Sequence, residues 1–207
     1  MLPGPTIIRK CSSCSGYIEQ FQITSGNTFG VKIWTDGWRD APMMPDQPLL
    51  VECPHCMALI WIEELEKTGE IDQWGGRDYK KGSEPYNTPG FERYLEFLKA
   101  GKITPEKVQY VRLRAWWAGN DTRRETGKKK PLSKAEVGNL EALADMLDDE
   151  DPDERLMKTE IMRELGRFDE AEKLLDQTFD DEYSKAVEIL RDLVRRGDSF
   201  VTEMRFN

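Results

Sequence analysis

The four cysteines are the residues of this chain whose type and spacing most directly indicate chemistry. They form two Cys-x-x-Cys pairs, Cys11 with Cys14 and Cys53 with Cys56, and 38 residues separate the two pairs. The turn inside such a pair lets both sulfur atoms point to one side, so two pairs together supply four thiolates at the Zn–S distance of about 2.3 Å. The spacing therefore predicts a metal site whose ligands are Cys11, Cys14, Cys53 and Cys56.

Three other roles for these cysteines stay open at this point. Disulfide bonds suit a secreted chain, but the segment beginning at Met1 has neither the basic nor the apolar region of a secretory signal. A thioredoxin-like redox pair needs one motif that opens a helix, whereas two motifs are present here. Iron of the rubredoxin kind uses the same four ligands as zinc. We favour Zn²⁺, and we expect His55, between two ligands, to be a solvent-facing residue of the knuckle.

Four thiolates fill a tetrahedral site, which leaves no position for a reactive water molecule. The metal is therefore expected to be structural. Two Cys-x-x-Cys knuckles with this separation resemble the zinc ribbon, a small β-rich module that its metal stabilises. We place this module over residues 1–66.

The segments around the cysteines have the composition of strands. Three short runs combine β-branched or aromatic residues with turn signals at their ends, and the prolines of residues 41–48 indicate an irregular loop. The runs are Tyr17–Ile23, Val31–Trp34 and Leu49–Glu52. In the segment Trp34-Thr35-Asp36-Gly37-Trp38 we expect a turn with Asp36-Gly37 at its tip and the tryptophans packed over the metal knuckles; an aromatic recognition surface is the alternative.

The second half of the chain has helical periodicity. Residues 67–87 are interpreted as a linker, because the stretch from Gln73 is rich in Gly, Pro, Lys and Asn and has no apolar period. Residues 88–207 then predict six helices, with capping signals at Thr104, Ser133 and Asp151. We expect the second helix to end at Gly119 and the sixth at Gly197. The fold class is therefore α+β, a small β-rich module followed by an all-helical half.

One segment of this half resembles the tetratricopeptide repeat. Gly166 ends a helix, Phe168 follows two residues later, and Ala171 lies early in the next helix, as in that family. Thr159 departs from the pattern, no proline follows Phe179, and a 34-residue period is absent. The resemblance covers about 30 residues and implies a tetratricopeptide-like helical bundle with a face that binds peptides or partner proteins.

The charge distribution limits the classes of partner. The net charge of the chain is −9, made up of −4 over residues 1–80, +6 over residues 81–132 and −11 over residues 133–207. An acidic helical half favours a basic partner. The stretch from Arg112 to Lys130 combines tryptophans with cations, which is the chemistry that binds single-stranded nucleic acid; the alternative is that its tryptophans belong to the core.

The sequence gives little support to catalysis. His55 is the single histidine, all cysteines are assigned to the metal, and no glycine-rich phosphate loop is present. We therefore expect a non-enzymatic, zinc-binding adaptor for protein interactions, located in the cytoplasm and without a membrane span. The alternatives are a nucleic-acid-associated zinc-ribbon factor and a small acidic immunity or inhibitor protein that covers a basic partner.

Overall fold

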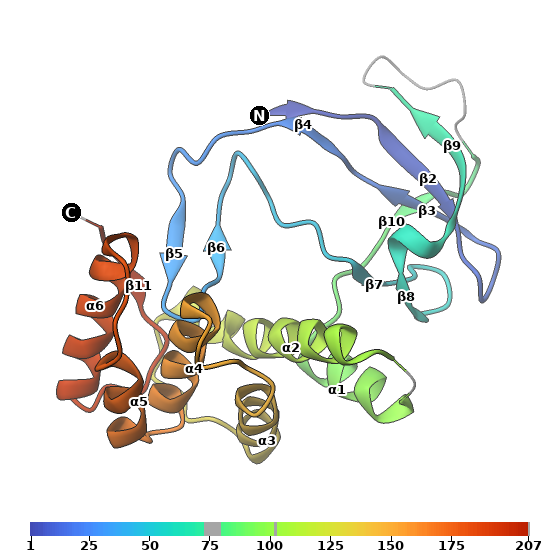
Figure 1. The fold of residues 1–207 in the computed structure, drawn as a ribbon. Coiled ribbons are helices and arrows are strands. Elements are labelled where there is room, and N and C mark those ends of the chain that lie inside the picture. The colour runs from blue at the N-terminus through green and yellow to red at the C-terminus, as the bar shows by residue number, and fades with distance from the viewer. Residues whose placement is uncertain (73–79, 102, 207) are drawn as a thin grey trace. The chain divides into compact units, whose positions relative to one another are not determined.

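The computed structural model describes residues 1–72, 80–101 and 103–206, and within them the chain is of mixed α and β structure (Figure 1). It divides into two compact units, each described here by itself. Residues 1–31 and 40–89 form the first, which we call the ribbon unit; residues 32–39 and 90–207 form the second, the helical unit. The sequence placed the start of the helical half at residue 88, close to this boundary, but residues 32–39 were assigned to the β-rich module.

The ribbon unit is built from short strands that form three small sheets. The largest has the strand order β10-β3-β2-β9, and β1 with β4 and β7 with β8 form two further antiparallel pairs. The strands are β1 (Leu2–Pro3), β2 (Thr6–Lys10), β3 (Tyr17–Gln20), β4 (Ile23–Ser25), β7 (Leu50–Glu52), β8 (Leu59–Trp61), β9 (Glu66–Ile71) and β10 (Glu84–Pro85). A 3-10 turn, Ile62–Glu64, follows β8.

The segment that we interpreted as a linker contributes two of these strands. β9 pairs with β2 in antiparallel register, from Thr6 opposite Ile71 to Lys10 opposite Glu66, and β10 pairs with β3. The linker composition begins only at Gln73, and residues 73–79 lie outside the described part of the chain. The strand from Glu66 was missed because its charged and glycine-containing sequence lacks the β-branched alternation on which strand prediction depends.

The helical unit contains six helices among its described residues, the number expected. They are α1 (Phe91–Ala100), α2 (Pro105–Thr126), α3 (Lys134–Ala144), α4 (Pro152–Glu164), α5 (Phe168–Leu175) and α6 (Ser184–Arg195), with a 3-10 turn, Asp181–Tyr183, before α6. Ser133 and Glu136 form the predicted capping box of α3, and Asp151 caps α4. α2 passes through Gly119, where we expected its end, and stops at Gly127, which is left-handed.

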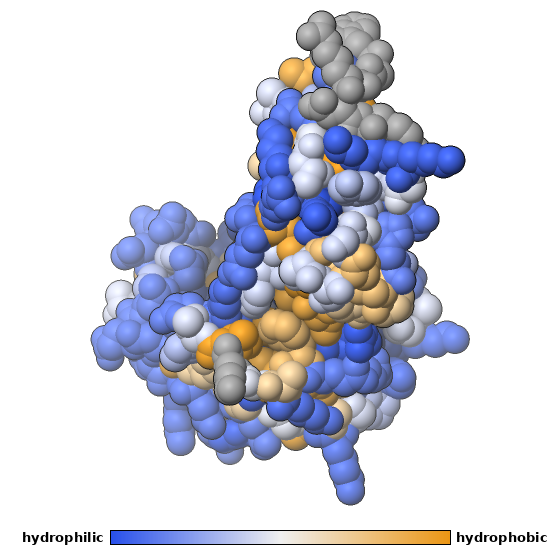
Figure 2. Space-filling view, turned by 90° about the vertical axis from the view of Figure 1, so that its right-hand side faces the viewer, coloured by the Kyte–Doolittle hydropathy of each residue, from blue (hydrophilic) through white to orange (hydrophobic). Residues whose placement is uncertain are grey.

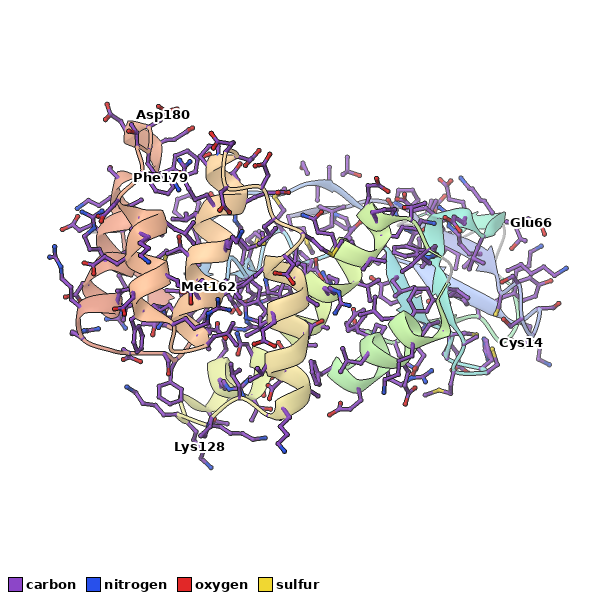
Figure 3. All side chains as sticks on the ribbon, turned by 60° about the horizontal axis from the view of Figure 1, so that its bottom comes forward. Cys14, Glu66, Lys128, Met162, Phe179 and Asp180 are labelled. Carbon is purple, nitrogen blue, oxygen red and sulfur yellow. The ribbon has the colours of Figure 1, made fainter. Side chains whose placement is uncertain are left out.

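The core of the helical unit lies between α2, α3, α4, α5 and α6. Its side chains are apolar and almost fully buried, and they include Trp116, Leu140, Leu143, Ile161, Ala171, Leu175 and Leu190. Figure 3 shows Met162, on α4, among the helices, and Lys128 projecting away from them. No helix in the described residues is both long and apolar enough to cross a membrane.

A small three-stranded sheet completes the helical unit. Its order is β11-β5-β6, where β5 is Lys32–Trp34, β6 is Arg39–Asp40 and β11 is Glu203–Met204. Residues from the N-terminal third of the chain thus pair with its C-terminal strand, Trp34 opposite Glu203. The helical unit is therefore not formed by the C-terminal half alone.

Candidate metal centre

The first pair of cysteines lies in the tight turn that joins β2 to β3. The amide of Ser15 donates to the carbonyl of Cys11 at 3.0 Å, and the amide of Cys11 donates to the carbonyl of Gly16 at 2.9 Å. Ser15 is one of two non-glycine residues in the described chain with a positive φ, +62°. These bonds hold both cysteine side chains on one side of the turn.

The second pair repeats this backbone geometry in the turn between β7 and β8. The amide of Met57 donates to the carbonyl of Cys53 at 2.9 Å, and the amide of Cys53 donates to the carbonyl of Ala58 at 2.9 Å. Met57 is the other non-glycine residue with a positive φ, +60°. Because left-handed backbone is unfavourable for residues with a Cβ, its presence at the same position in both turns indicates two knuckles of one kind.

The two knuckles bring the four sulfur atoms together. The Sγ atoms of Cys11 and Cys56 are 3.9 Å apart, those of Cys14 and Cys53 are 3.8 Å apart, and all four lie within 4.8 Å of one another. A tetrahedron with Zn–S bonds of about 2.3 Å has edges of about 3.8 Å. The observed separations therefore fit a single tetrahedral ion, and the four residues predicted from the sequence are the four that the structure gathers.

Backbone amides face the sulfur atoms and favour their ionised form. Ser13 N–H lies 3.4 Å from the Cys11 sulfur, and Gly16 N–H lies 3.4 Å from the Cys14 sulfur. In the second knuckle the amides of His55 and Cys56 donate to Cys53, and that of Ala58 donates to Cys56. Such donors offset part of the charge of a four-thiolate site, which is −2 with a divalent ion.

The thiols differ in how easily they ionise. Burial would raise the pKa of Cys11, but the amides of Cys14 and Ser13 outweigh it and lower the pKa to about 7. Burial raises the pKa of Cys53 to about 12, despite the amides that donate to it. Neighbouring thiolates repel one another, so a divalent cation is the partner that allows all four groups to ionise.

The His55 side chain connects the two knuckles by a hydrogen bond and a packing contact. It is not needed as a metal ligand, because the four sulfur atoms complete a tetrahedral site. Its Nε2 atom lies 2.9 Å from the carbonyl oxygen of Tyr17, and its ring covers Gly16 so closely that a Cβ there would lie 2.4 Å from the ring. The side chain is exposed, as expected for a knuckle residue, but it also has this packing role. A side chain at position 16 would therefore require the His55 ring to move.

A small apolar cluster supports the metal centre from inside the ribbon unit. Cys11 and Cys53 are themselves buried in it, next to Ile18, Val51, Ile60, Ile62 and Leu65. Cys14 and Cys56 are the outer pair of the site. With Ile8 and Leu50, nine apolar or thiol side chains are buried among the described residues of this unit, which is a modest core for 81 residues, so cross-linking by a metal would stabilise it.

The tryptophan turn has a different position from the one we expected. Gly37 is left-handed at the tip of the turn, with φ +79°. Trp38, however, packs edge-on against Trp117 of α2 at 5.4 Å between ring centroids, and Arg114 and Arg124 lie over its ring. The prediction that these tryptophans cover the metal knuckles is thus wrong for Trp38, because its ring is used by the helical unit.

The basic, aromatic stretch of α2 is largely internal. Trp116 is 3% exposed in the core, Arg114 is 5% exposed, and Arg123 is 6% exposed and paired with Glu136 at 2.6 Å. Arg124 is also buried and forms an ion pair with Asp36. The exposed cations of this stretch include Lys128, Lys129 and Lys130, and Lys129 pairs with Asp198. The tryptophan and arginine groups needed for base stacking are therefore mostly committed to the fold.

Three buried carboxyl groups in the helical unit were missed by the sequence analysis. Asp36, Glu160 and Glu164 are each at most 5% exposed. Glu160 forms a bidentate ion pair with Arg163. The side-chain amide of Asn120 donates to both Asp36 and Glu164 at 3.0 Å. In the sequence, only the unusual Trp34–Trp38 motif drew attention to Asp36. Nothing distinguished the acidic residues of α4 as buried, because acidic residues are common on helix surfaces.

Comparison with known proteins adds no further assignment. No family model, curated protein or solved structure matches the chain. The described residues thus form a β-rich unit, which carries a candidate four-cysteine metal centre, and a helical unit.

Proposed function

We propose that this protein is a non-enzymatic adaptor whose ribbon unit is stabilised by one structural Zn²⁺ ion. The observation that carries the proposal is the closed set of four sulfur atoms, all within 4.8 Å of one another. Four thiolates leave no coordination position for substrate or for an activated water molecule, so the metal has a structural role. Iron in the same site would lead to the same conclusion about the fold.

The helical unit is the part that we propose to bind a partner protein. Gly166 is left-handed with φ +74°, and Ala171 is completely buried where α4 and α5 pack together. These features support the tetratricopeptide-like character of this helix pair, and such helix pairs are used as protein-binding surfaces. The charge of −11 over residues 133–207 favours a basic partner, since complementary charge increases the rate of encounter.

The ribbon unit offers a second contact surface. Seven of the eight large hydrophobic side chains that are exposed among the described residues belong to it: Met1, Leu2, Phe21, Phe29, Met44, Leu49 and Met57. Phe29 is 83% exposed. Apolar residues are also visible among hydrophilic ones on the molecular face in Figure 2. We propose that these side chains contribute to an interaction surface of the ribbon unit; exposed apolar side chains are typical of such a surface where they form one contiguous patch.

Affinity capture with the metal-loaded chain as bait tests this proposal. We expect a basic protein to be retained, and its retention to fall as salt is raised from about 50 to about 500 mM, because charge attraction is screened. The bait Asp180→Lys with Asp181→Lys, which reverses exposed charge before α6, should retain less of it than the matched control Glu63→Lys with Glu66→Lys in the ribbon unit. Retention of nucleic acid in place of protein would contradict the adaptor role.

A further inference from the structure

The four cysteines of the candidate metal centre differ in their access to solvent. Cys11 and Cys53 are 2% and 0% exposed and belong to the apolar cluster of the ribbon unit. Cys14 and Cys56 are exposed. Each knuckle therefore has an inner cysteine, which is its first, and an outer cysteine, which is its second. A small oxidant in solution meets the outer pair first.

Each outer sulfur atom lies next to an inner sulfur atom of the other knuckle. The two Sγ atoms are 3.8 Å apart for Cys14 and Cys53, and 3.9 Å apart for Cys56 and Cys11. Because the S–S bond of a disulfide is about 2.0 Å long, each pair has to close by about 1.8 Å to form one. Movement on this scale is possible once no ion lies between the sulfur atoms.

Metal binding keeps the outer sulfur atoms in their reactive form. A cysteine that ligates a divalent ion is a thiolate, and the thiolate is the form that attacks an oxidant. The amide of Gly16, 3.4 Å from the Cys14 sulfur, also stabilises this form. Redox-sensing cysteines combine thiolate character, access to solvent and a neighbouring sulfur that resolves the first oxidation product. Cys14 and Cys56 have all three properties when the site holds Zn²⁺.

We propose that Cys14 and Cys56 are the sites at which a peroxide oxidises the metal centre, and that disulfides Cys14–Cys53 and Cys11–Cys56 then replace the ion as the link between the knuckles. The inference rests on the proposed function, because it requires the bound metal. It adds a redox switch to that function, in which an oxidant causes the release of one Zn²⁺ ion.

The reaction balances with hydrogen peroxide as the oxidant. The Cys14 thiolate attacks one peroxide oxygen, so that an S–O bond forms, the O–O bond breaks, and the hydroxide that leaves takes up a proton. The Cys53 thiolate then attacks the sulfur of this sulfenic acid, and the S–S bond forms as a second hydroxide leaves and becomes water. Cys56 and Cys11 react in the same way. Two peroxide molecules and four protons thus convert four thiolates into two disulfides and four water molecules.

Disulfides between the knuckles keep the ribbon unit cross-linked after the ion has left. A bond within one knuckle, Cys11–Cys14 or Cys53–Cys56, would not join the two knuckles, and a unit with a modest core would lose its cross-link. The product of the proposed reaction is therefore a metal-free ribbon unit that remains folded. A thiol reductant together with Zn²⁺ returns it to the metal-bound form.

Trapping the first oxidation product tests the role of the outer pair. The reduced full chain is loaded with Zn²⁺, its metal content is measured, and less than one equivalent of hydrogen peroxide is added with dimedone, which reacts with sulfenic acids. Mass mapping should find at least about tenfold more adduct at Cys14 and Cys56 than at Cys11 and Cys53. The matched control is the chain unfolded in urea with a chelator, in which the four cysteines should differ by less than about threefold.

A second measurement follows the ion and the disulfides without dimedone. About two peroxide molecules should be consumed for each Zn²⁺ ion that is released to a chromophoric chelator. Mass mapping of the product should find the disulfides Cys14–Cys53 and Cys11–Cys56. Reduction with dithiothreitol and addition of Zn²⁺ should restore the initial metal content.

Three results with the zinc-loaded chain would overturn the inference. They are retention of the ion in peroxide that oxidises free glutathione under the same conditions, equal dimedone adducts at all four cysteines, and disulfides formed only within the knuckles. Each of them leaves the structural metal centre itself in place. A chain that takes up no metal at the start would contradict the proposed function, and the redox switch with it.

Discussion

Asp36 shows how a single side chain in the N-terminal third of the chain is used by the helices. It is 1% exposed, Asn120 donates to it at 3.0 Å, and Arg124 forms an ion pair with it. Burial nevertheless raises its pKa from 3.8 to about 6. A shift of this size corresponds to roughly 3 kcal/mol of differential stability between the protonated and ionised forms.

The raised pKa of Asp36 predicts a definite dependence of stability on pH. Between about pH 4 and pH 6 the folded state binds this proton and the unfolded state does not, so this group lowers the free energy of unfolding as pH rises and has no further effect above its folded pKa. The Asp36→Asn variant has no ionisable group at this position, so its free energy of unfolding does not fall for this reason as pH rises. The stability of Asp36→Asn relative to the native chain should therefore increase by up to about 3 kcal/mol from pH 4 to pH 7.

Urea denaturation of both chains across this pH range measures the difference directly. Because only the difference between the two chains is used, the titration of carboxyl groups that do not interact with Asp36 cancels; the charge of Asp36 raises the pKa of Glu164, so that group is followed separately in both chains. A difference that is constant with pH, or one that decreases as pH rises, would mean that attraction to Arg124 outweighs burial.

Ala171 marks the close contact of α4 and α5. The residue is completely buried, and its neighbours in the core include Leu174 and Leu175. Ala171→Leu should lower the free energy of unfolding of the helical unit by about 1–3 kcal/mol through overpacking, with the metal content unchanged. Thermal unfolding followed at 222 nm checks this, with exposed Glu172→Leu as the control; an unaltered midpoint for Ala171→Leu would contradict the packing described here.

At this scale, residues whose chemistry is local were predictable and residues that act through distant partners were not. The Cys-x-x-Cys pairs were recognised because each pair is a single turn, and the structure brings the four sulfur atoms together as expected. The partners of Asp36 are 84 and 88 positions away in the sequence. No local pattern encodes a contact of that separation.

Most helix ends with a capping signal were predicted well; Thr104 precedes α2 as expected, but its side chain forms no capping hydrogen bond. Ser133 with Glu136, Asp151, Gly166 and Gly197 behave as their sequence context indicates. Gly119 was taken as a helix end, but it lies inside α2, where Phe91 and Glu136 pack beside it. A glycine alone does not distinguish a helix end from a close contact in its middle.

The segment Lys32–Arg39 is the element whose role the sequence concealed. Thr35 accepts from Thr202 N–H at 3.0 Å and lies 3.3 Å from the Nη2 atom of buried Arg163, and the indole of Trp117 donates to the carbonyl of Asp36 at 2.8 Å. Without this segment, buried groups of α2 and α4 would lose their partners. Each such loss costs about 1–3 kcal/mol, and more for a charged group.

A chain that begins at Gly90 should therefore be clearly less stable than the helical unit of the full protein. We expect its urea midpoint to be lower, and a synthetic peptide of residues 30–41 to raise that midpoint when added. The peptide with Thr35→Ala, Asp36→Ala and Trp38→Ala serves as the control. Equal midpoints for the fragment and the full chain, with no effect of the peptide, would show that the segment is not part of the folding unit.

For the whole molecule, the charge pattern separates the adaptor from a nucleic-acid-binding factor. Because phosphate binding depends on exposed cations and weakens steeply with salt, it should be strongest at about 50 mM salt. With most of the α2 arginines buried, we expect no retention of single- or double-stranded DNA or RNA at that salt. Retention that is abolished by Lys128→Glu with Lys130→Glu would contradict the proposed function.

The central claim, one metal ion held by four cysteines, is tested most directly by metal analysis of the reduced protein. We predict one zinc or iron ion per chain, retained in His55→Ala, where only the contact with Tyr17 and Gly16 is lost. Cys53→Ser should release the ion and unfold the ribbon unit while most of the helical signal at 222 nm remains, because the helices have their own core. A chain purified without chelator that contains neither zinc nor iron, and that does not take up Zn²⁺ stoichiometrically, would contradict the account.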